Sequence, residues 1–110
     1  MAKSATELKT IFSTLINCLK EKGVKVNRLY LYGSYASGRP RPDSDIDIAV
    51  ISSSFDKKNL VQRQEILGEI IFPLGEPIEA IGYSLREFKQ AHPFSFLREI
   101  ITHGKIIYAK

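Results

Sequence analysis

Residues 43–50 constrain the fold more than any other segment, because acidic and apolar side chains alternate there before the chain becomes wholly apolar. Side chains two apart in a β-strand point to the same face, with Cα atoms about 6.5–7 Å apart. The pattern predicts a strand at residues 45–51 that buries Asp45 and Asp47 on one face and apolar side chains on the other. Like charges held close together are costly unless a cation binds them. The segment therefore predicts a divalent metal site.

A Gly-Ser turn comes shortly before this strand and predicts a phosphate-binding site beside the metal. Gly33 and Ser34 directly follow a segment at residues 26–32 that favours a strand. Glycine lets the backbone approach a ligand closely, and exposed amides in such a turn bind anions. Arg39 and Arg41 lie in the following loop and could make forked contacts with phosphate oxygens. The same two arginines flank prolines and are also compatible with a purely solvated role.

Glu79 is a third candidate ligand, in a further predicted strand at residues 78–83 that we expect to be largely buried. If that strand pairs beside residues 45–51, Glu79 would complete a cluster of three carboxylates. Hard oxygen ligands of this kind select Mg²⁺ or Mn²⁺. Two such ions about 3.5–4 Å apart would stabilise the attacking and leaving oxygens of a phosphoryl displacement. Taken alone, Glu79 fits a charge that faces water from an edge strand better than it fits a metal ligand.

Two better-known motifs are excluded. An EF-hand that begins at Asp43 would need glycine where Ile48 stands and glutamate where Ser54 stands. A P-loop would need Gly-Lys followed by Ser or Thr, and neither Gly33 nor Gly38 leads into that sequence. The prediction of a metal and phosphate site therefore depends on the conjunction of the Gly-Ser turn, the Asp-x-Asp strand and the later acidic strand.

Hydrophobic periodicity and turn residues place the remaining elements. The predicted order is α-β-β-α-β-α-α-β, which indicates an α/β (α+β) fold with a small mixed sheet and helices packed against it, in a single domain at residues 1–110. The predicted elements are a helix at 5–22, a strand at 26–32, a loop at 33–44, a strand at 45–51, a helix at 57–71, a strand at 78–83, a short helix after Ser84, a helix from Pro93 to Gly104 and a strand at 105–108.

Composition narrows the class of protein. The net charge of +4 suits a polyanionic ligand, but the basic residues are dispersed and no nucleic-acid recognition motif occurs. A single cysteine, Cys18, excludes an internal disulfide and a cysteine-based metal site. No apolar run is long enough to cross a bilayer, and the polar N-terminus is typical of a helix rather than a signal peptide. We therefore expect a cytoplasmic protein that does not bind membranes.

Residues 31–38 together with residues 43–50 closely resemble the DNA polymerase β-like nucleotidyltransferase superfamily and, within it, the minimal nucleotidyltransferase (MNT) domains of the antitoxin type. The pattern of that family is an apolar residue, Gly-Ser, about ten residues and then Asp-x-Asp. Here ten residues separate Ser34 from Asp45. Residues 94–100 and 104–108 also resemble the C-terminal end of the family. The resemblance implies the nucleotidyltransferase fold over nearly the whole chain.

Residue by residue, the resemblance implies a two-metal site. Gly33 and Ser34 would bind the triphosphate of ATP, and Asp45 and Asp47 would hold two Mg²⁺ ions. Glu79 would match the third carboxylate, which is usually Asp in the family, and would help to activate an acceptor hydroxyl. Ser37 stands where many members carry Arg, so Arg39 or Arg41 would have to supply that phosphate contact.

The resemblance also implies a partner. Larger relatives append a helical domain that grips the base and the acceptor, and we expect this chain to lack one. A helical HEPN-type toxin would complete the site and receive AMP on a tyrosine hydroxyl, so that the chain acts as an antitoxin; self-association is another way to complete it. Two alternatives are an antitoxin that binds without catalysis and a transferase that modifies a small-molecule hydroxyl.

Overall fold

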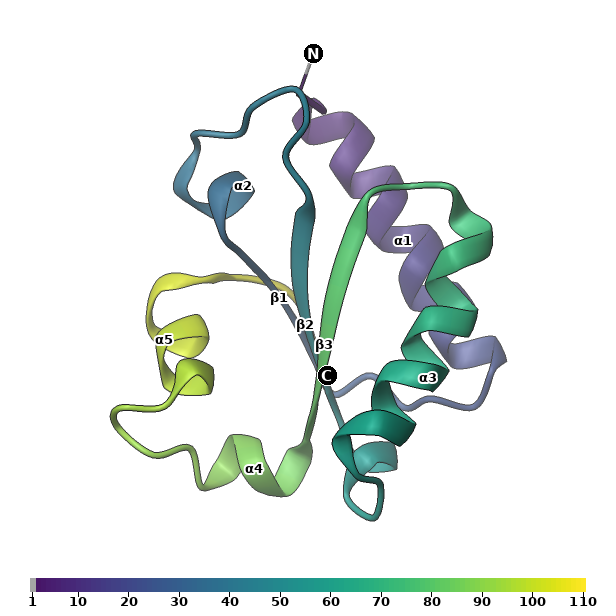
Figure 1. Cartoon of the computed structure of the whole chain (residues 1–110), viewed down its shortest axis with the longest axis vertical. Helices are drawn as coiled ribbons and strands as arrows, with labels where there is room; N and C mark the ends of the chain where they lie inside the picture. Colours follow the sequence, from purple (N-terminus) through teal and green to yellow (C-terminus); the bar gives the residue numbers. More distant parts are fainter. Residues whose placement is uncertain (1) are drawn as a thin grey trace.

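The computed structural model describes residues 2–110, which form a four-stranded sheet between two layers of helices (Figure 1). The strand order is β3-β2-β1-β4. Strand β1 (Arg28–Tyr32) pairs antiparallel with β2 (Ile46–Ser52) and with β4 (Lys105–Ala109). Strand β3 (Ile78–Ser84) runs parallel to β2. The predicted small mixed sheet is therefore confirmed.

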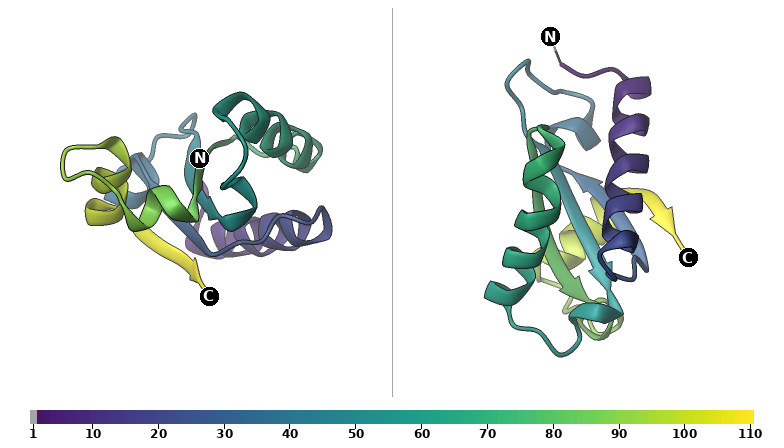
Figure 2. Two further views of the ribbon diagram at one scale, coloured as in Figure 1. Left: turned by 90° about the horizontal axis from the view of Figure 1, so that it is seen from below. Right: turned by 90° about the vertical axis from the view of Figure 1, so that its right-hand side faces the viewer.

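Helices α1 (Ala5–Glu21) and α3 (Leu60–Ile71) lie next to each other on one face of the sheet (Figure 2). Ser4 and Glu7 form the capping box that starts α1, and Gly23, at φ +81°, follows its last turn. The apolar stripes of both helices pack against Ile46, Ile48 and Val50 of β2 in the main core. None of the helices within residues 2–110 is long and apolar enough to cross a membrane.

Helices α4 (Leu85–Lys89) and α5 (Phe96–His103) cover the opposite face of the sheet. Tyr30, Ala49 and Ile51 are buried beneath them, together with Leu97 and Ile100 of α5. The C-terminal part of β2 is therefore apolar on both faces. Only the N-terminal end of the strand, where Asp47 lies, leaves this second face open for polar side chains.

Several element boundaries differ from the prediction. The segment expected as a loop at residues 33–44 contains a short helix, α2 (Ser34–Ser37), in which Ser37 Oγ donates to the carbonyl of Ser34 at 3.0 Å. The helix expected from residue 57 begins after Asn59, and the helix expected from Pro93 begins after Ser95. Both residues are N-caps whose side chains accept a backbone N–H. These caps decide where each helix starts.

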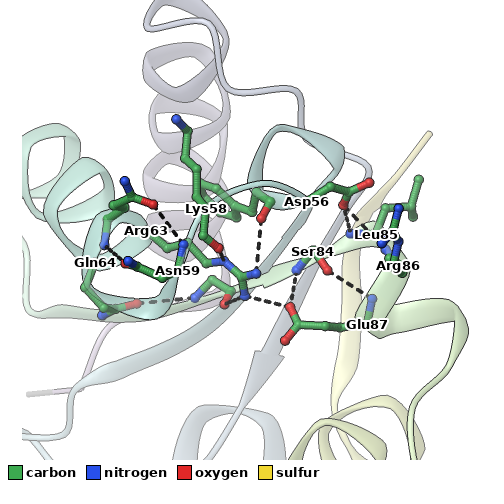
Figure 3. Close-up of polar contacts among 12 residues, drawn as sticks. Asp56, Lys58, Asn59, Arg63, Gln64, Ser84, Leu85, Arg86 and Glu87 are labelled. Atoms are coloured by element: carbon green, nitrogen blue, oxygen red, sulfur yellow. Dashed lines mark hydrogen bonds and ion pairs between the residues drawn. The ribbon is translucent and has the colours of Figure 1, made fainter.

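A polar network at the C-terminal end of β3 was not predicted (Figure 3). Arg63 of α3 is buried and donates to the carbonyls of Phe55, Lys58 and Gly82. Its Nη1 also lies 2.6 Å from Oε1 of Glu87. That carboxylate accepts the backbone N–H of Ser84, which caps α4. One arginine thus ties α3, the preceding loop and α4 to the end of β3.

Candidate active site

The predicted carboxylates lie at the N-terminal ends of β2 and β3. In the parallel pairing of these strands Asp47 lies opposite Glu79, and in the antiparallel pairing with β1 it lies opposite Tyr32. Directly opposed residues project from the same face of a sheet. A row across three strands is therefore formed by Tyr32, Asp47 and Glu79. It lies on the same face of the sheet as α4 and α5, which cover that face nearer the C-terminal ends of β2 and β3. The pairing of the third predicted strand beside the second, which was the condition for Glu79 to join the aspartates, is present in the structure.

The row is more open than the sequence predicts. Asp47 is half-buried, whereas Asp45 and Glu79 are exposed. The expectation that the strand buries both aspartates is wrong for Asp45, because β2 begins only at Ile46 and Asp45 belongs to the preceding loop. The expectation of a largely buried Glu79 is also wrong, because β3 is an edge strand and Glu79 belongs to the face opposite Ile78 and Ala80, which pack on the main core.

The electrostatics of the row are unfavourable in the absence of a cation. Partial burial raises the pKa of Asp47, and the charges of Glu79 and Asp45 raise it further. Burial, followed by the charges of Asp47, Glu79 and Tyr83, raises the pKa of Tyr32 to about 12. The ion pairs among residues 2–110 involve other acids, namely Glu76, Glu87 and Glu99. The site therefore favours a positively charged ligand.

The donor set fits a hard divalent cation, because all three acids offer carboxylate oxygens. Within the described residues, however, no three side chains of His, Cys, Asp or Glu are already gathered as a metal site. Asp45 and Glu79 are exposed, so their side chains can rotate toward Asp47 without disturbing the core. The backbone thus brings the acids to one end of the sheet and leaves the final convergence to side-chain rotation.

Gly33 lies directly against Asp47. It has φ +74° and ψ −154°, a conformation that is costly for any residue with a side chain. A Cβ atom at this position would overlap the carboxylate of Asp47. The Gly33 carbonyl accepts the amides of Ala36 and Ser37, which closes the turn into α2. The structure therefore brings the two predicted motifs, the Gly-Ser turn and the Asp-x-Asp strand, into contact.

The remaining predicted phosphate ligands are less firmly placed. Ser34 is the first residue of α2 and is half-buried. Arg39 and Arg41 are exposed in the loop between α2 and β2, where the amide of Arg41 donates to Ser44 Oγ at 2.7 Å. Neither guanidinium donates a side-chain hydrogen bond to another described residue. Both arginines follow the Gly-Ser turn closely in the sequence, but no hydrogen bond within the described residues fixes the position of their guanidinium groups.

Sequence reasoning missed a pocket of about 390 Å³ between α2 and α5, adjoining Gly33. Side chains of α5 form one wall, and Phe96 meets Tyr32 edge to face, with ring centroids 5.6 Å apart. His103 also lines this pocket, and its Nε2 lies 3.6 Å from Oε1 of Glu99. No local pattern signals the pocket, because its walls come from distant segments. The lining residues are Tyr32, Gly33, Ala36, Ser37, Phe96, Glu99, Ile100, His103 and Gly104.

Residues 13–110 match the model of the polymerase β nucleotidyltransferase family. The chain belongs to this family. The match includes the Gly-Ser turn, the Asp-x-Asp strand and Glu79, and it agrees with the family resemblance that the sequence motifs indicate. The prediction that the protein is a nucleotidyltransferase is thereby confirmed at the level of the family.

Two relatives carry names that specify a reaction. MJ0604 of Methanocaldococcus jannaschii, named provisionally as a protein adenylyltransferase, is 29% identical over 94 residues, which cover 84% of this chain and 90% of MJ0604. The protein adenylyltransferase MntA of Shewanella oneidensis is 27% identical over 94 residues. That alignment covers 86% of this chain but only 62% of MntA, so the chain spans less than two thirds of that relative.

Solved structures confirm the fold. A provisionally named nucleotidyltransferase from Sulfolobus solfataricus superposes with a TM-score of 0.65 at 18% identity, over 100% of this chain and 91% of that protein. A chain from a toxin–antitoxin complex with AMP-PNP superposes with a TM-score of 0.64 at 24% identity, over 89% of this chain and 73% of its own. At these identities the likeness establishes the nucleotidyltransferase fold.

Proposed function

We propose that this protein is a Mg²⁺-dependent adenylyltransferase that moves AMP from ATP to a hydroxyl of a protein partner. The observation that carries the proposal is the contact between the Gly33 turn and Asp47, with Glu79 in register on the neighbouring strand. The turn could bind an anion through its amides, and the carboxylates beside it form no ion pair within residues 2–110. A nucleoside triphosphate with its divalent cations supplies both the anion and the positive charge that such a site favours.

The chain's residues would divide the work between binding and activation. Amides of the Gly33–Ser34 turn and the Ser34 hydroxyl would hold the triphosphate, and Arg39 or Arg41 would approach its outer oxygens. Asp45 and Asp47 would hold two Mg²⁺ ions (Mn²⁺ is an alternative), with Glu79 as the third carboxylate. When bound, the ions would neutralise charge on the phosphates and acidify the attacking hydroxyl. Glu79 would also orient that hydroxyl and accept its proton, so that the hydroxyl oxygen would bond to the α-phosphorus in line as the bond to pyrophosphate breaks.

We further propose that the acceptor is a tyrosine of a helical HEPN-type toxin in the cytoplasm, so that the protein acts as an antitoxin. The relative MntA is named a protein adenylyltransferase, and structural neighbours come from toxin–antitoxin complexes, one of them with AMP-PNP. Asp45 and Glu79 are exposed and Asp47 is half-buried, so these carboxylates are accessible to a side chain from a second protein.

Co-expression with the candidate toxin and purification of the complex would test this proposal. With labelled ATP and Mg²⁺, the wild-type protein should add AMP to the partner, and mass spectrometry should locate the nucleotide on a tyrosine. Asp45→Asn should abolish the labelling. Asp43→Asn, which changes a nearby exposed acid that is not one of the three candidate metal ligands, should retain it. If the toxin is neutralised with no added nucleotide and Asp45→Asn neutralises it equally well, the chain acts by binding alone. Labelling of a small-molecule hydroxyl in place of the toxin would overturn the choice of acceptor.

A further inference from the structure

The side of α3 that is turned away from the sheet carries an exposed apolar stripe. Val61, Glu65, Gly68 and Phe72 follow one another at helical spacing, which places them on one side of the helix. Val61 is 67% exposed and Phe72 is 87% exposed. Phe72 directly follows α3 and keeps helical dihedrals, so its ring continues the stripe. We call these four residues, together with the neighbouring Glu69, the α3 face.

The α3 face is remote from the carboxylate row. Helix α3 packs with α1 on one face of the sheet, whereas the row lies on the face that α4 and α5 share (Figure 1). A groove of about 410 Å³ lies at the N-terminal end of the stripe and is lined by Leu60, Val61, Gln64 and Glu65. The Gln64 wall is fixed, because its Nε2 donates to the carbonyl of Ala80 at 3.0 Å and its Oε1 accepts the amide of Gly82.

Gly68 lies in the middle of the stripe, where neither the backbone nor the packing of the described residues requires a glycine. It does not belong to the glycines with positive φ, and nothing lies within 4 Å of the place that its Cβ would occupy. Glycine inside a helix lowers stability relative to alanine. The missing side chain leaves a notch between Val61 and Phe72, and such a notch lets a side chain of a second helix come close to the backbone of α3.

The charges of the α3 face select the chemistry of a partner. Glu65 and Glu69 are exposed, and neither belongs to an ion pair within residues 2–110. A second copy of α3 packed against the first would bring four glutamates into one interface, where like charges repel. A helix with Lys or Arg beside its apolar stripe would neutralise them instead.

We propose that the α3 face is a docking surface for a basic amphipathic helix of a second protein. Val61 and Phe72 are the apolar anchors, Gly68 receives a facing side chain, and the two glutamates select a basic partner. The inference goes beyond the proposed transfer of AMP, because docking on this face requires neither ATP nor a metal ion. A helix bound there would leave the carboxylate row on the other face of the sheet open to an acceptor.

Two synthetic amphipathic peptides test the charge preference. They share one leucine stripe, and their polar positions are all lysine in one peptide and all glutamate in the other. In fluorescence anisotropy titrations without nucleotide, the lysine peptide should bind about 10-fold more tightly than the glutamate peptide. The chain has a net charge of +4, so a non-specific attraction would favour the glutamate peptide. Equal or tighter binding of the glutamate peptide overturns the proposal.

A matched pair of charge variants locates the preference on α3. Glu65→Gln combined with Glu69→Gln removes two negative charges, and Glu21→Lys makes the same change in net charge at an exposed position on α1. The double variant should lose the preference for the lysine peptide, whereas Glu21→Lys should keep it. The proposal is overturned if both proteins lose the preference equally, or if the double variant keeps it.

The apolar anchors are tested in the same way. Phe72→Ser should weaken binding of the lysine peptide about 10-fold. Phe94→Ser, which removes a ring that is 93% exposed and lies outside the α3 face, should bind the peptide like the wild type. Gly68→Ala should raise the melting temperature and yet weaken binding, because its methyl group fills the notch. A weakening in Phe94→Ser as large as in Phe72→Ser, or normal binding in Phe72→Ser, overturns the proposal.

Sedimentation velocity of the protein alone tests the alternative occupant. We expect a monomer, because the glutamates of two α3 faces repel one another. A dimer that Phe72→Ser converts to a monomer would show that a second copy covers the face, and it would overturn the choice of a basic partner. None of these measurements depends on AMP transfer, so failure of the docking surface and failure of the proposed function are distinguishable.

Discussion

Glu79 and Glu87 lie near opposite ends of β3, in opposite electrostatic surroundings. Burial alone would raise the pKa of Glu87, but hydrogen bonds from Ser84 and Arg63 lower it below its ordinary value. At the other end, Glu79 lies opposite Asp47, and partial burial and neighbouring acids raise the pKa of Asp47. Within residues 2–110, one end of the strand therefore has a counter-charge from the chain itself, and the other end does not.

The difference separates a structural network from a binding site. Every buried side-chain polar atom among residues 2–110 has a hydrogen-bond partner, including those of Arg63. The Arg63 network is thus complete without a ligand. The row that contains Asp47 keeps uncompensated negative charge at a cost in stability, which is characteristic of groups that are balanced by a ligand. Substitutions at the two ends should therefore have opposite consequences for stability and activity.

The largest expected effect is the loss of activity in Asp47→Asn. Removing the carboxylate should lower the rate of AMP transfer by about 100- to 1000-fold, as for other groups that stabilise transition-state charge. The melting temperature should stay the same or rise, because a repulsive charge is removed beside Glu79 and Asp45. Transfer assays and calorimetry on the same preparation would check both. A variant that loses activity because it unfolds would contradict the assignment of Asp47 to the binding site.

Arg63→Met should show the opposite pattern, in which stability is lost and AMP transfer is retained. The variant removes the charged partner of Glu87 and one donor from each of three backbone carbonyls, and it should lower the free energy of unfolding by about 3 kcal/mol. Urea denaturation would measure the loss, and AMP transfer should persist at temperatures where the variant is folded. Addition of Glu87→Gln should recover part of the lost stability. Unchanged stability in Arg63→Met would show that the network has no structural role.

Gly33→Ala should have a smaller effect that combines both consequences. The new methyl group would overlap the Asp47 carboxylate and would hold alanine at φ +74°. We expect a loss of stability of roughly 1–3 kcal/mol and an impaired transfer rate because Asp47 is displaced. Gly38→Ala is a useful comparison, since its φ of +78° carries the backbone strain but nothing lies where its Cβ would be. If both variants lose activity equally, the contact with Asp47 is not what matters.

The carboxylate row was predictable from the sequence because its determinants are local. The alternation at residues 45–51 fixes which side chains share a face, and the spacing from Ser34 to Asp45 indicates the family. One assumption was needed in addition, namely that the strand of Glu79 pairs beside the strand of Asp47. In the structure β3 does pair with β2, and Glu79 lies opposite Asp47. Exposure was harder to predict, because it depends on where the helices stop covering the sheet.

The Arg63 network and the α2–α5 pocket could not be predicted, because tertiary packing alone creates them. Arg63 occupies an ordinary position in a helical pattern, and only its burial against β3 reveals its partners. Phe96 belongs to a helix whose start depends on the cap at Ser95, which competes with Pro93 in the sequence. The meeting of Phe96 with Tyr32 depends on how α5 packs on the sheet, which no local signal determines.

The smallest expected effect is a difference in how the two acids couple stability to pH. The folded-state pKa of Glu87 is lowered from its ordinary 4.5, so Glu87 contributes stability that is full above 4.5 and is lost as pH falls through the lower folded value. The pKa of Asp47 is raised from its ordinary 3.8, so its ionisation costs stability above the raised value, and that cost disappears as pH falls toward 3.8. Glu87 is exposed and Asp47 is only half-buried, so solvent screening should keep each contribution below about 1 kcal/mol.

Unfolding free energies at pH 7 and at pH 4 would separate the two contributions. The stability advantage of the wild type over Glu87→Gln should shrink as the pH falls, whereas the wild type should gain on Asp47→Asn over the same interval. These opposite trends follow from the presence of Arg63 at one end of β3 and the absence of a described counter-charge at the other. Parallel trends in the two variants would mean that the ends of β3 do not differ electrostatically in the way the structure indicates.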